Sequence, residues 1–151
     1  MEKYFKIEFS KGGIFKAKLL EDSAPKTCKN ILDSLPFSCS VLTALNGSFS
    51  GQILYPTKIF TYNEVENPVV FGVQSGDIFL NTNANKSTFD NEFIPPRVMI
   101  AYSSSVILWN WAGWQPSNHF ARIMEGDLRE LFQIGRRIKW DGKEDVTCSV
   151  I

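Results

Sequence analysis

Residues 12–37, GGIFKAKLLEDSAPKTCKNILDSLPF, give the clearest indication of the fold that we expect for this chain. Apolar and basic side chains alternate from residue 14 to residue 20, as they do in a strand with one buried face. After this strand, Asp22 or Ser23 can cap a helix, and Pro25 suits the first helical turn. Apolar residues then recur at helical spacing until a second proline ends the helix. The stretch therefore predicts a strand followed by one amphipathic helix.

The rest of the chain adds strands and one more helix. Residues 4–9 alternate in the same way and precede a Lys-Gly-Gly turn, so they form an antiparallel hairpin with the strand at 14–20. A second helix is expected over residues 125–138. Shorter strands are expected within 41–62 and at 76–80, 98–102, 106–109, 120–123 and 145–151. This pattern predicts a mostly β protein, a closed antiparallel β-barrel with a helix over each end.

Composition favours one folded domain over residues 1–151. A chain of 151 residues falls within the roughly 100–200 residues that are usual for a domain. Apolar residues make up 44% of the chain and charged residues 21%, which is ordinary for a globular protein. Because 16 basic residues balance 16 acidic ones, no long-range field draws the chain to nucleic acid or to an anionic membrane. We expect neither as a partner.

The cysteines and the N-terminal residues indicate a compartment. Cys28, Cys39 and Cys148 are odd in number and lack C-x-x-C spacing, which argues against a disulfide framework and a zinc site. Buried thiols in a reducing compartment fit them better. The opening MEKYFKIEF has no apolar signal region, and no apolar run approaches the roughly 20 residues that cross a membrane. We therefore expect a cytoplasmic protein.

Two motifs at opposite ends of the chain resemble the cyclophilins. The first is D-x-x-P-K-T-x-x-N, which opens the first helix in that family and is matched here by Asp22, Pro25, Lys26, Thr27 and Asn30. The second is FARIMEGDLRELFQIG, residues 120–135, which is similar to a cyclophilin segment near the end of the chain. The resemblance implies a closed eight-stranded β-barrel with two capping helices. It also implies that the last strand pairs with the first.

The middle of the chain departs from the active enzymes. Active cyclophilins resemble one another in an F-H-R segment, whose arginine hydrogen-bonds the prolyl nitrogen, and in a later Q-G-G-D. This chain has LNGSFSGQILYPTKIF at residues 45–60 instead, and Arg97 lies elsewhere. Gly51 to Pro56 and Ser75 to Ile78 look more like an uncharacterised family of short bacterial cyclophilin-like proteins, a domain of unknown function. We therefore do not expect an active peptidyl-prolyl isomerase.

Two side chains could act as an acid or a base. His119 is the only histidine, and an imidazole titrates near neutrality. No acidic residue is visibly placed to orient it, and Asp77 and Glu125 look isolated, so a surface or structural role for His119 stays open. Tyr55 could line a groove on the barrel, although it could equally belong to the solvated face of an edge strand.

The other candidates are ligand-binding residues. Trp109, Trp111 and Trp114 could form the aromatic wall of a groove, and the resemblance makes Trp111 the nearest match to a groove tryptophan. Core packing or the interface of a homo-oligomer would explain them as well. Gln52 could line the same groove. If Phe120 faces the core, Arg122 could lie on the same face at the rim and bind an anion, unless it is simply solvated.

These residues leave three functions open. The first is a barrel that binds a small molecule or a short peptide in an aromatic groove. The second is an enzyme that acts on a small metabolite through His119 or Tyr55. The third is a weak prolyl isomerase. No metal-binding, nucleophile or phosphate-loop motif is present in the sequence, so we expect neither a metal nor a cofactor.

Overall fold

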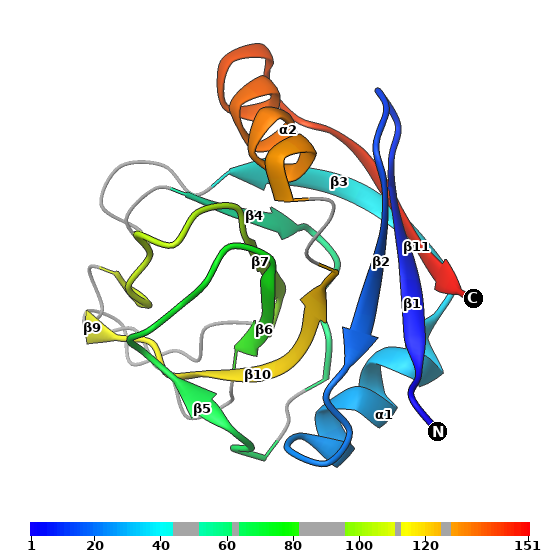
Figure 1. The fold of residues 1–151 in the computed structure, drawn as a ribbon, viewed down its shortest axis with the longest axis vertical. Coiled ribbons are helices and arrows are strands. Elements are labelled where there is room, and N and C mark those ends of the chain that lie inside the picture. The colour runs from blue at the N-terminus through cyan, green and yellow to red at the C-terminus, as the bar shows by residue number, and fades with distance from the viewer. Residues whose placement is uncertain (44–51, 62–63, 82–95, 111–112, 125–127) are drawn as a thin grey trace.

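A computed structural model describes residues 1–43, 52–61, 64–81, 96–110, 113–124 and 128–151 of the chain. Its main sheet runs in the order β2-β1-β11-β3-β4-β7-β6-β10, and β10 pairs back onto β2. The main sheet is therefore a closed eight-stranded antiparallel barrel (Figure 1). Its strands are β1 (Tyr4–Phe9), β2 (Ile14–Leu19), β3 (Phe37–Thr43), β4 (Ile53–Pro56), β6 (Asp77–Asn81), β7 (Val98–Ala101), β10 (Ser117–Ile123) and β11 (Glu144–Val150).

The two ends of the chain meet in this barrel. In the ladder between β1 and β11, Phe5 pairs with Val150 and Phe9 pairs with Val146, so the last strand lies beside the first (Figure 1). The predicted alternation of β1 and β2 is confirmed, because every second residue of each strand is buried. The expected eight-stranded barrel with two helices is likewise confirmed.

Three short strands complete the described sheet structure. β5 (Pro68–Val69) pairs with the start of β10, along the same edge that β2 occupies further on. β8 (Trp109–Asn110) pairs with β9 (Gly113–Trp114) in a separate two-stranded ladder. The strand that was expected at residues 106–109 is therefore wrong in its extent, since only Trp109 of that range is in a strand and it does not join the barrel.

The first helix is capped differently from the prediction. α1 (Pro25–Ser34) begins after Ala24, and neither Asp22 nor Ser23 caps it through a side chain. The carboxylate of Glu66 takes this role instead, because it accepts hydrogen bonds from the backbone N–H groups of Lys26 and Thr27, each at 3.0 Å. The cap therefore comes from a segment 40 residues away along the chain.

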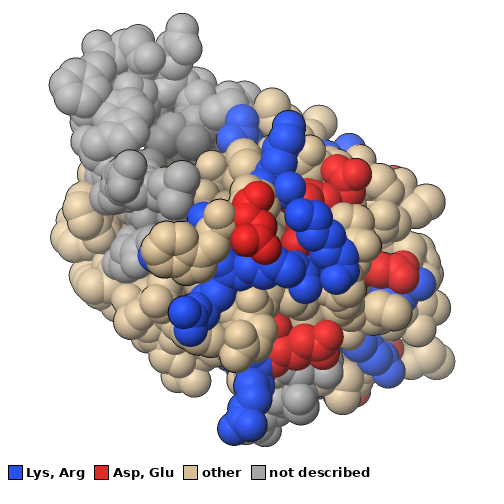
Figure 2. Space-filling model, turned by 90° about the horizontal axis from the view of Figure 1, so that it is seen from above, with Lys and Arg blue, Asp and Glu red and all other residues tan. Residues whose placement is uncertain are grey.

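The second helix lies over the barrel near β3 (Figure 1). α2 (Leu128–Asp141) runs three residues beyond the predicted end, and residues 125–127 of the prediction lie outside the described residues. Its apolar stripe enters the barrel core through Leu131, Ile134 and Ile138. Figure 2 shows the molecule from this end, where basic and acidic side chains are interspersed rather than gathered into a surface of one sign.

The barrel wall is buried on both faces along part of its circumference. All five residues of β6 are buried. Ile78 and Leu80 point into the barrel core, whereas Phe79 packs outside it in a second apolar cluster. The other buried members of this outer cluster are Ile53, Val73, Met99, Ala101, Val106 and Leu108. Of the described helices, neither is long and apolar enough to cross a membrane.

Candidate functional site

The two acid–base candidates lie on the same outer face of the barrel. Phe79 pairs with Met99 on one side and with His119 on the other, so one row of residues crosses β7, β6 and β10. Tyr55 in β4 packs against the cluster that contains Met99 and Phe79. The structure thus brings Tyr55 and His119 to one face, with two buried apolar side chains between them.

His119 is held tightly on this face. Its ring lies 4.9 Å from the ring of Phe79, and its side chain is only 11% exposed. Its backbone N–H donates to the carbonyl of Asn67, whose side-chain amide donates back to the carbonyl of His119. Nε2 lies 3.3 Å from Oδ1 of Asp77, but the two atoms are not aligned as a hydrogen bond. A group held this way is better placed to support neighbouring side chains than to meet a substrate.

Asp77, which looks isolated in the sequence, is the acidic partner of His119 and Arg122. It is 3% exposed, and its Oδ1 accepts a hydrogen bond of 2.8 Å from Nε of Arg122. Its Oδ2 accepts one of 2.9 Å from the backbone N–H of Gln74. Burial is the largest single influence and opposes ionisation, but His119, the N–H of Gln74 and Arg122 together hold the pKa of Asp77 below its ordinary value. The ionised carboxylate of Asp77 therefore links β6 to β10 through Arg122, and to the turn before β6 through Gln74.

Arg122 lies on the opposite face of β10 from the one expected. The register of β10 against β6 shifts between His119 and Ala121, so that Phe120 and Ala121 both enter the barrel core. The expectation that Arg122 shares the face of Phe120 is therefore wrong. The irregularity turns Arg122 outward, where it meets Asp77 and keeps 55% of its side chain exposed.

Two of the three tryptophans can be placed, and they are on the surface. Trp109 and Trp114 are direct partners in the β8–β9 ladder, with exposed fractions of 39% and 62%. The ring of Trp114 lies 5.3 Å from the ring of Phe71, which is also 62% exposed. We call Phe71, Trp109 and Trp114 the aromatic surface. Trp111 lies outside the described residues.

Gln52 has a structural contact next to this outer face. Its side-chain oxygen accepts a hydrogen bond of 3.0 Å from the hydroxyl of Ser105, and its backbone carbonyl accepts one from the N–H of Tyr102. These bonds tie the start of β4 to the segment that follows β7. Gln52 is thus occupied in holding the segment that leads to the aromatic surface.

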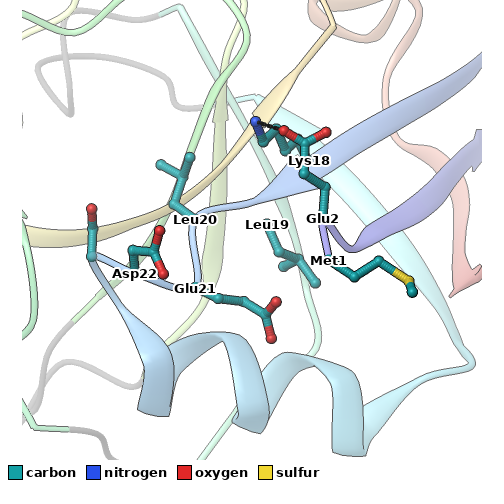
Figure 3. A pocket seen from close by; sticks show the side chains of 8 residues that line it. Met1, Glu2, Lys18, Leu19, Leu20, Glu21 and Asp22 are labelled. Atoms are coloured by element: carbon teal, nitrogen blue, oxygen red, sulfur yellow. Dashed lines mark hydrogen bonds and ion pairs between the residues drawn. The ribbon is translucent and has the colours of Figure 1, made fainter.

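Two hollows open between β2 and its surroundings. One, of about 400 Å³, lies between Lys18 and Leu20 of the β2 end, Arg122 to Met124 of the β10 end, and Leu128 of α2. The other, of about 320 Å³, lies between the first residues of the chain and the turn before α1 (Figure 3). Lys18 and Leu20 line both hollows, and Figure 3 shows Lys18 bound to Glu2 at the edge of the smaller one.

A family model described as protein of unknown function (DUF3830) matches residues 8–150. The chain belongs to the DUF3830 family. No curated protein is similar enough to count as a relative of this DUF3830 chain. Among the described residues, no group of three His, Cys, Asp or Glu side chains is placed to hold a metal ion.

Solved structures place this DUF3830 chain among the cyclophilin-like folds. McbB in complex with tryptophan matches with a TM-score of 0.72 at 16% identity, over 97% of this chain and 44% of McbB. The chain thus spans less than half the length of McbB. A hypothetical protein from Archaeoglobus fulgidus matches with a TM-score of 0.57 at 19% identity, over 99% of this chain and 95% of its own.

A third structure is a cyclophilin-type peptidyl-prolyl cis-trans isomerase from Cryptosporidium parvum in the presence of the dipeptide Ala-Pro. It matches with a TM-score of 0.57 at 14% identity, over 99% of both chains. At such low identities these likenesses show the fold of the DUF3830 chain. They confirm the cyclophilin-like barrel that the two terminal motifs predicted.

Proposed function

We propose that this protein binds a small molecule or a short peptide that carries a ring, and that the ring packs on the aromatic surface formed by Phe71, Trp109 and Trp114. The observation that carries this proposal is the exposure of three large aromatic side chains on adjoining segments. Exposed apolar groups of this size gain free energy when a ligand removes them from water. The tilted rings of Phe71 and Trp114 offer both a flat face and an edge to a ligand ring.

Two structural neighbours support the class of ligand. McbB was solved with tryptophan, and the Cryptosporidium parvum isomerase was solved with the dipeptide Ala-Pro. Both ligands are small and both carry a ring. McbB binds tryptophan and the isomerase was solved in the presence of Ala-Pro, so these two compounds are the first probes for a chain of the same fold.

Tryptophan fluorescence can test the proposal with a matched control. L-tryptophan itself would obscure the signal, so the Ala-Pro dipeptide is titrated by fluorescence and L-tryptophan by calorimetry. Trp114→Ala should weaken binding by about 2–12-fold, the range expected for one aromatic contact of about 0.5–1.5 kcal/mol. Trp140→Ala is the control, because Trp140 is 75% exposed on α2 and lies outside the aromatic surface. Equal affinities of Trp114→Ala and Trp140→Ala for the probes, or no binding of either probe to the wild type, would contradict the proposal.

An enzyme that uses His119 is the second candidate. The observation in its favour is the proximity of Nε2 to the ionised carboxylate of Asp77, which resembles the way catalytic imidazoles are oriented. The low exposure of the His119 side chain and the apolar residues between His119 and Tyr55 favour a supporting role instead. A metabolite-converting activity that is abolished in His119→Ala but retained in Trp114→Ala would favour the enzyme.

A further inference from the structure

We propose that the hollow of about 400 Å³ between the ends of β2 and β10 and the start of α2 binds a carboxylate that carries a short apolar chain. We call it the Arg122 hollow. It lies at the C-terminal end of β10. The N-terminal end of β10 begins at Ser117, which pairs with β5 and follows Trp114 of the aromatic surface by three residues. The two sites can therefore be tested independently.

The charges around the Arg122 hollow favour an anion. Lys18 and Arg122 both line it and face each other directly across the β2–β10 ladder. Lys18 is ion-paired with Glu2 and Arg122 with Asp77, so an anion would be attracted by the N–H groups of the two bases that these contacts leave exposed. The carboxylates that partner these bases stand away from the opening, because Asp77 is buried behind Arg122 and Glu2 lines the smaller hollow. No Asp or Glu is found among the described residues that line the Arg122 hollow.

The orientation of Arg122 suits a carboxylate in particular. Its contact with Asp77 uses Nε, more than half of the side chain is exposed, and the side chain lines the hollow. A guanidinium fixed through Nε keeps the N–H groups of its two terminal nitrogens for another acceptor. A planar carboxylate accepts from such nitrogens through two hydrogen bonds, which a spherical anion does not match. Asp77 thus acts as a positioning residue for Arg122.

The other residues that line the Arg122 hollow indicate which kind of molecule carries the bound carboxylate. Leu20, Ile123, Met124 and Leu128 supply apolar surface, and Gln74 and Ser75 supply the polar rim. Gln74 is fixed by its backbone hydrogen bond to Asp77, so the same carboxylate shapes the rim and orients the base. A volume of about 400 Å³ lies at the small end of ligand sites. It suits a chain of several carbons rather than a macromolecule.

Calorimetric titration with hexanoate tests this inference, and hexanamide serves as the neutral probe of similar shape. Hexanoate should bind at least about tenfold more tightly than hexanamide, because a charge-assisted hydrogen bond contributes more than a neutral one. Added sodium chloride should weaken hexanoate binding. Arg122→Gln should reduce hexanoate affinity at least about tenfold, whereas Arg136→Gln, which changes an exposed base on α2, should leave it unchanged.

A second variant keeps the test valid if Arg122→Gln disturbs Asp77 and the fold. Met124→Glu adds a carboxylate to the lining at a side chain that is 48% exposed, and it leaves the contact between Arg122 and Asp77 in place. It should weaken hexanoate binding and leave hexanamide binding unchanged. Trp114→Ala should not alter hexanoate binding. Absence of hexanoate binding, equal binding of both probes, or undiminished hexanoate binding in Met124→Glu would overturn the inference.

Discussion

The carboxylate of Asp77 is bound by the guanidinium of Arg122 across the β6–β10 ladder, with Oδ1 and Nε 2.8 Å apart. The two side chains differ sharply in exposure, since that of Asp77 is 4% exposed and that of Arg122 is 55% exposed. The same oxygen of Asp77 lies 3.3 Å from Nε2 of His119. One buried negative charge therefore orients a surface base and lies beside the single histidine.

This arrangement predicts how stability depends on acid pH. Because the pKa of Asp77 is lowered in the folded protein, the unfolded chain takes up a proton first as the pH falls. The stabilisation of the folded protein by ionised Asp77 is complete above the pKa that Asp77 has in the unfolded chain. It is lost as the pH falls through the pKa that Asp77 has in the folded protein. Asp77→Asn removes this contribution, so its destabilisation should be largest near neutrality and should shrink in acid. Urea unfolding of both proteins between about pH 2 and pH 7 measures the difference.

The control for this experiment is Asp33→Asn, which changes an exposed carboxylate paired with Lys29 within α1. Its effect on the free energy of unfolding should stay below about 0.5 kcal/mol at every pH. A constant difference between wild type and Asp77→Asn across the acid range would contradict the assignment of a lowered pKa to Asp77.

Glu66 should matter for stability because it caps a helix from a distance. Its carboxylate accepts hydrogen bonds from the backbone of Lys26 and Thr27 and from the hydroxyl of Thr27. Glu66→Ala should lower the free energy of unfolding by about 1–2 kcal/mol, as the loss of an N-terminal cap does. Glu64→Ala is the matched control, since its ion pair with Lys26 is exposed and should contribute much less than the cap does. Equal effects in urea unfolding would show that Glu66 does not act as a cap.

The barrel itself was predictable because its signals are local. Alternation in residues 4–9 and 14–20 specifies a hairpin without reference to the rest of the chain, and the D-x-x-P-K-T-x-x-N motif specifies where the first helix begins. The structure gives this motif a physical reason. Lys26 pairs with Glu64, while Thr27 binds both Glu66 and the side-chain amide of Asn118, so the motif ties α1 to β10.

The candidate site was less predictable because it depends on pairings between distant residues. Asp77 and Arg122 are 45 positions apart, and only the β6–β10 register brings them together. The register shift near Phe120 then reverses the face that simple alternation gives to Arg122. One usable signal was present, since Asp77 and Phe79 alternate with Ile78 and Leu80 in a strand that is buried on both faces. A buried carboxylate in a strand requires a partner, so this pattern predicts a base on a neighbouring strand.

Arg137 and Glu144 should form one of the larger single contributions to stability. The Glu144 side chain is 1% exposed and accepts two hydrogen bonds from Arg137, each 2.8 Å long, and one from the backbone of Lys11. Arg137→Ala leaves a buried carboxylate without its base, which costs about 3 kcal/mol or more. Lys29→Ala, which breaks an exposed pair on α1, should cost less than about 1 kcal/mol. If urea unfolding gives comparable losses of unfolding free energy for the two variants, the buried ion pair contributes no more to stability than the exposed one.

The cysteines should differ in their reactivity toward a disulfide reagent. Burial raises the pKa of the Cys28 and Cys148 thiols to about 12 each. At pH 8 both thiols are therefore protonated and shielded, and the native protein should release at most one equivalent of the chromophore rapidly, from the half-buried Cys39. Cys39→Ser should abolish that rapid phase, and urea should expose the remaining thiols. Rapid reaction of two thiols in native Cys39→Ser would contradict the burial.

Gly135 should tolerate no side chain, although it lies in the middle of a helix. A Cβ at this position would lie 2.5 Å from Cδ2 of Tyr102, a residue that is 2% exposed and packed in the core. Alanine normally stabilises a helix relative to glycine by about 1 kcal/mol. Here the clash should outweigh that gain, so Gly135→Ala should lower the free energy of unfolding by about 1–3 kcal/mol. Gln133→Ala, an exposed change in the same helix, should have little effect.

A double-mutant cycle identifies the cause of the Gly135 effect. Tyr102→Leu removes the ring that a Cβ would meet, so Gly135→Ala should cost much less in that background than in the wild type. The coupling free energy from the four unfolding curves should be at least about 0.5 kcal/mol in the direction of rescue. A Gly135→Ala protein that is more stable than wild type, or a coupling near zero, would show that α2 can shift away from Tyr102.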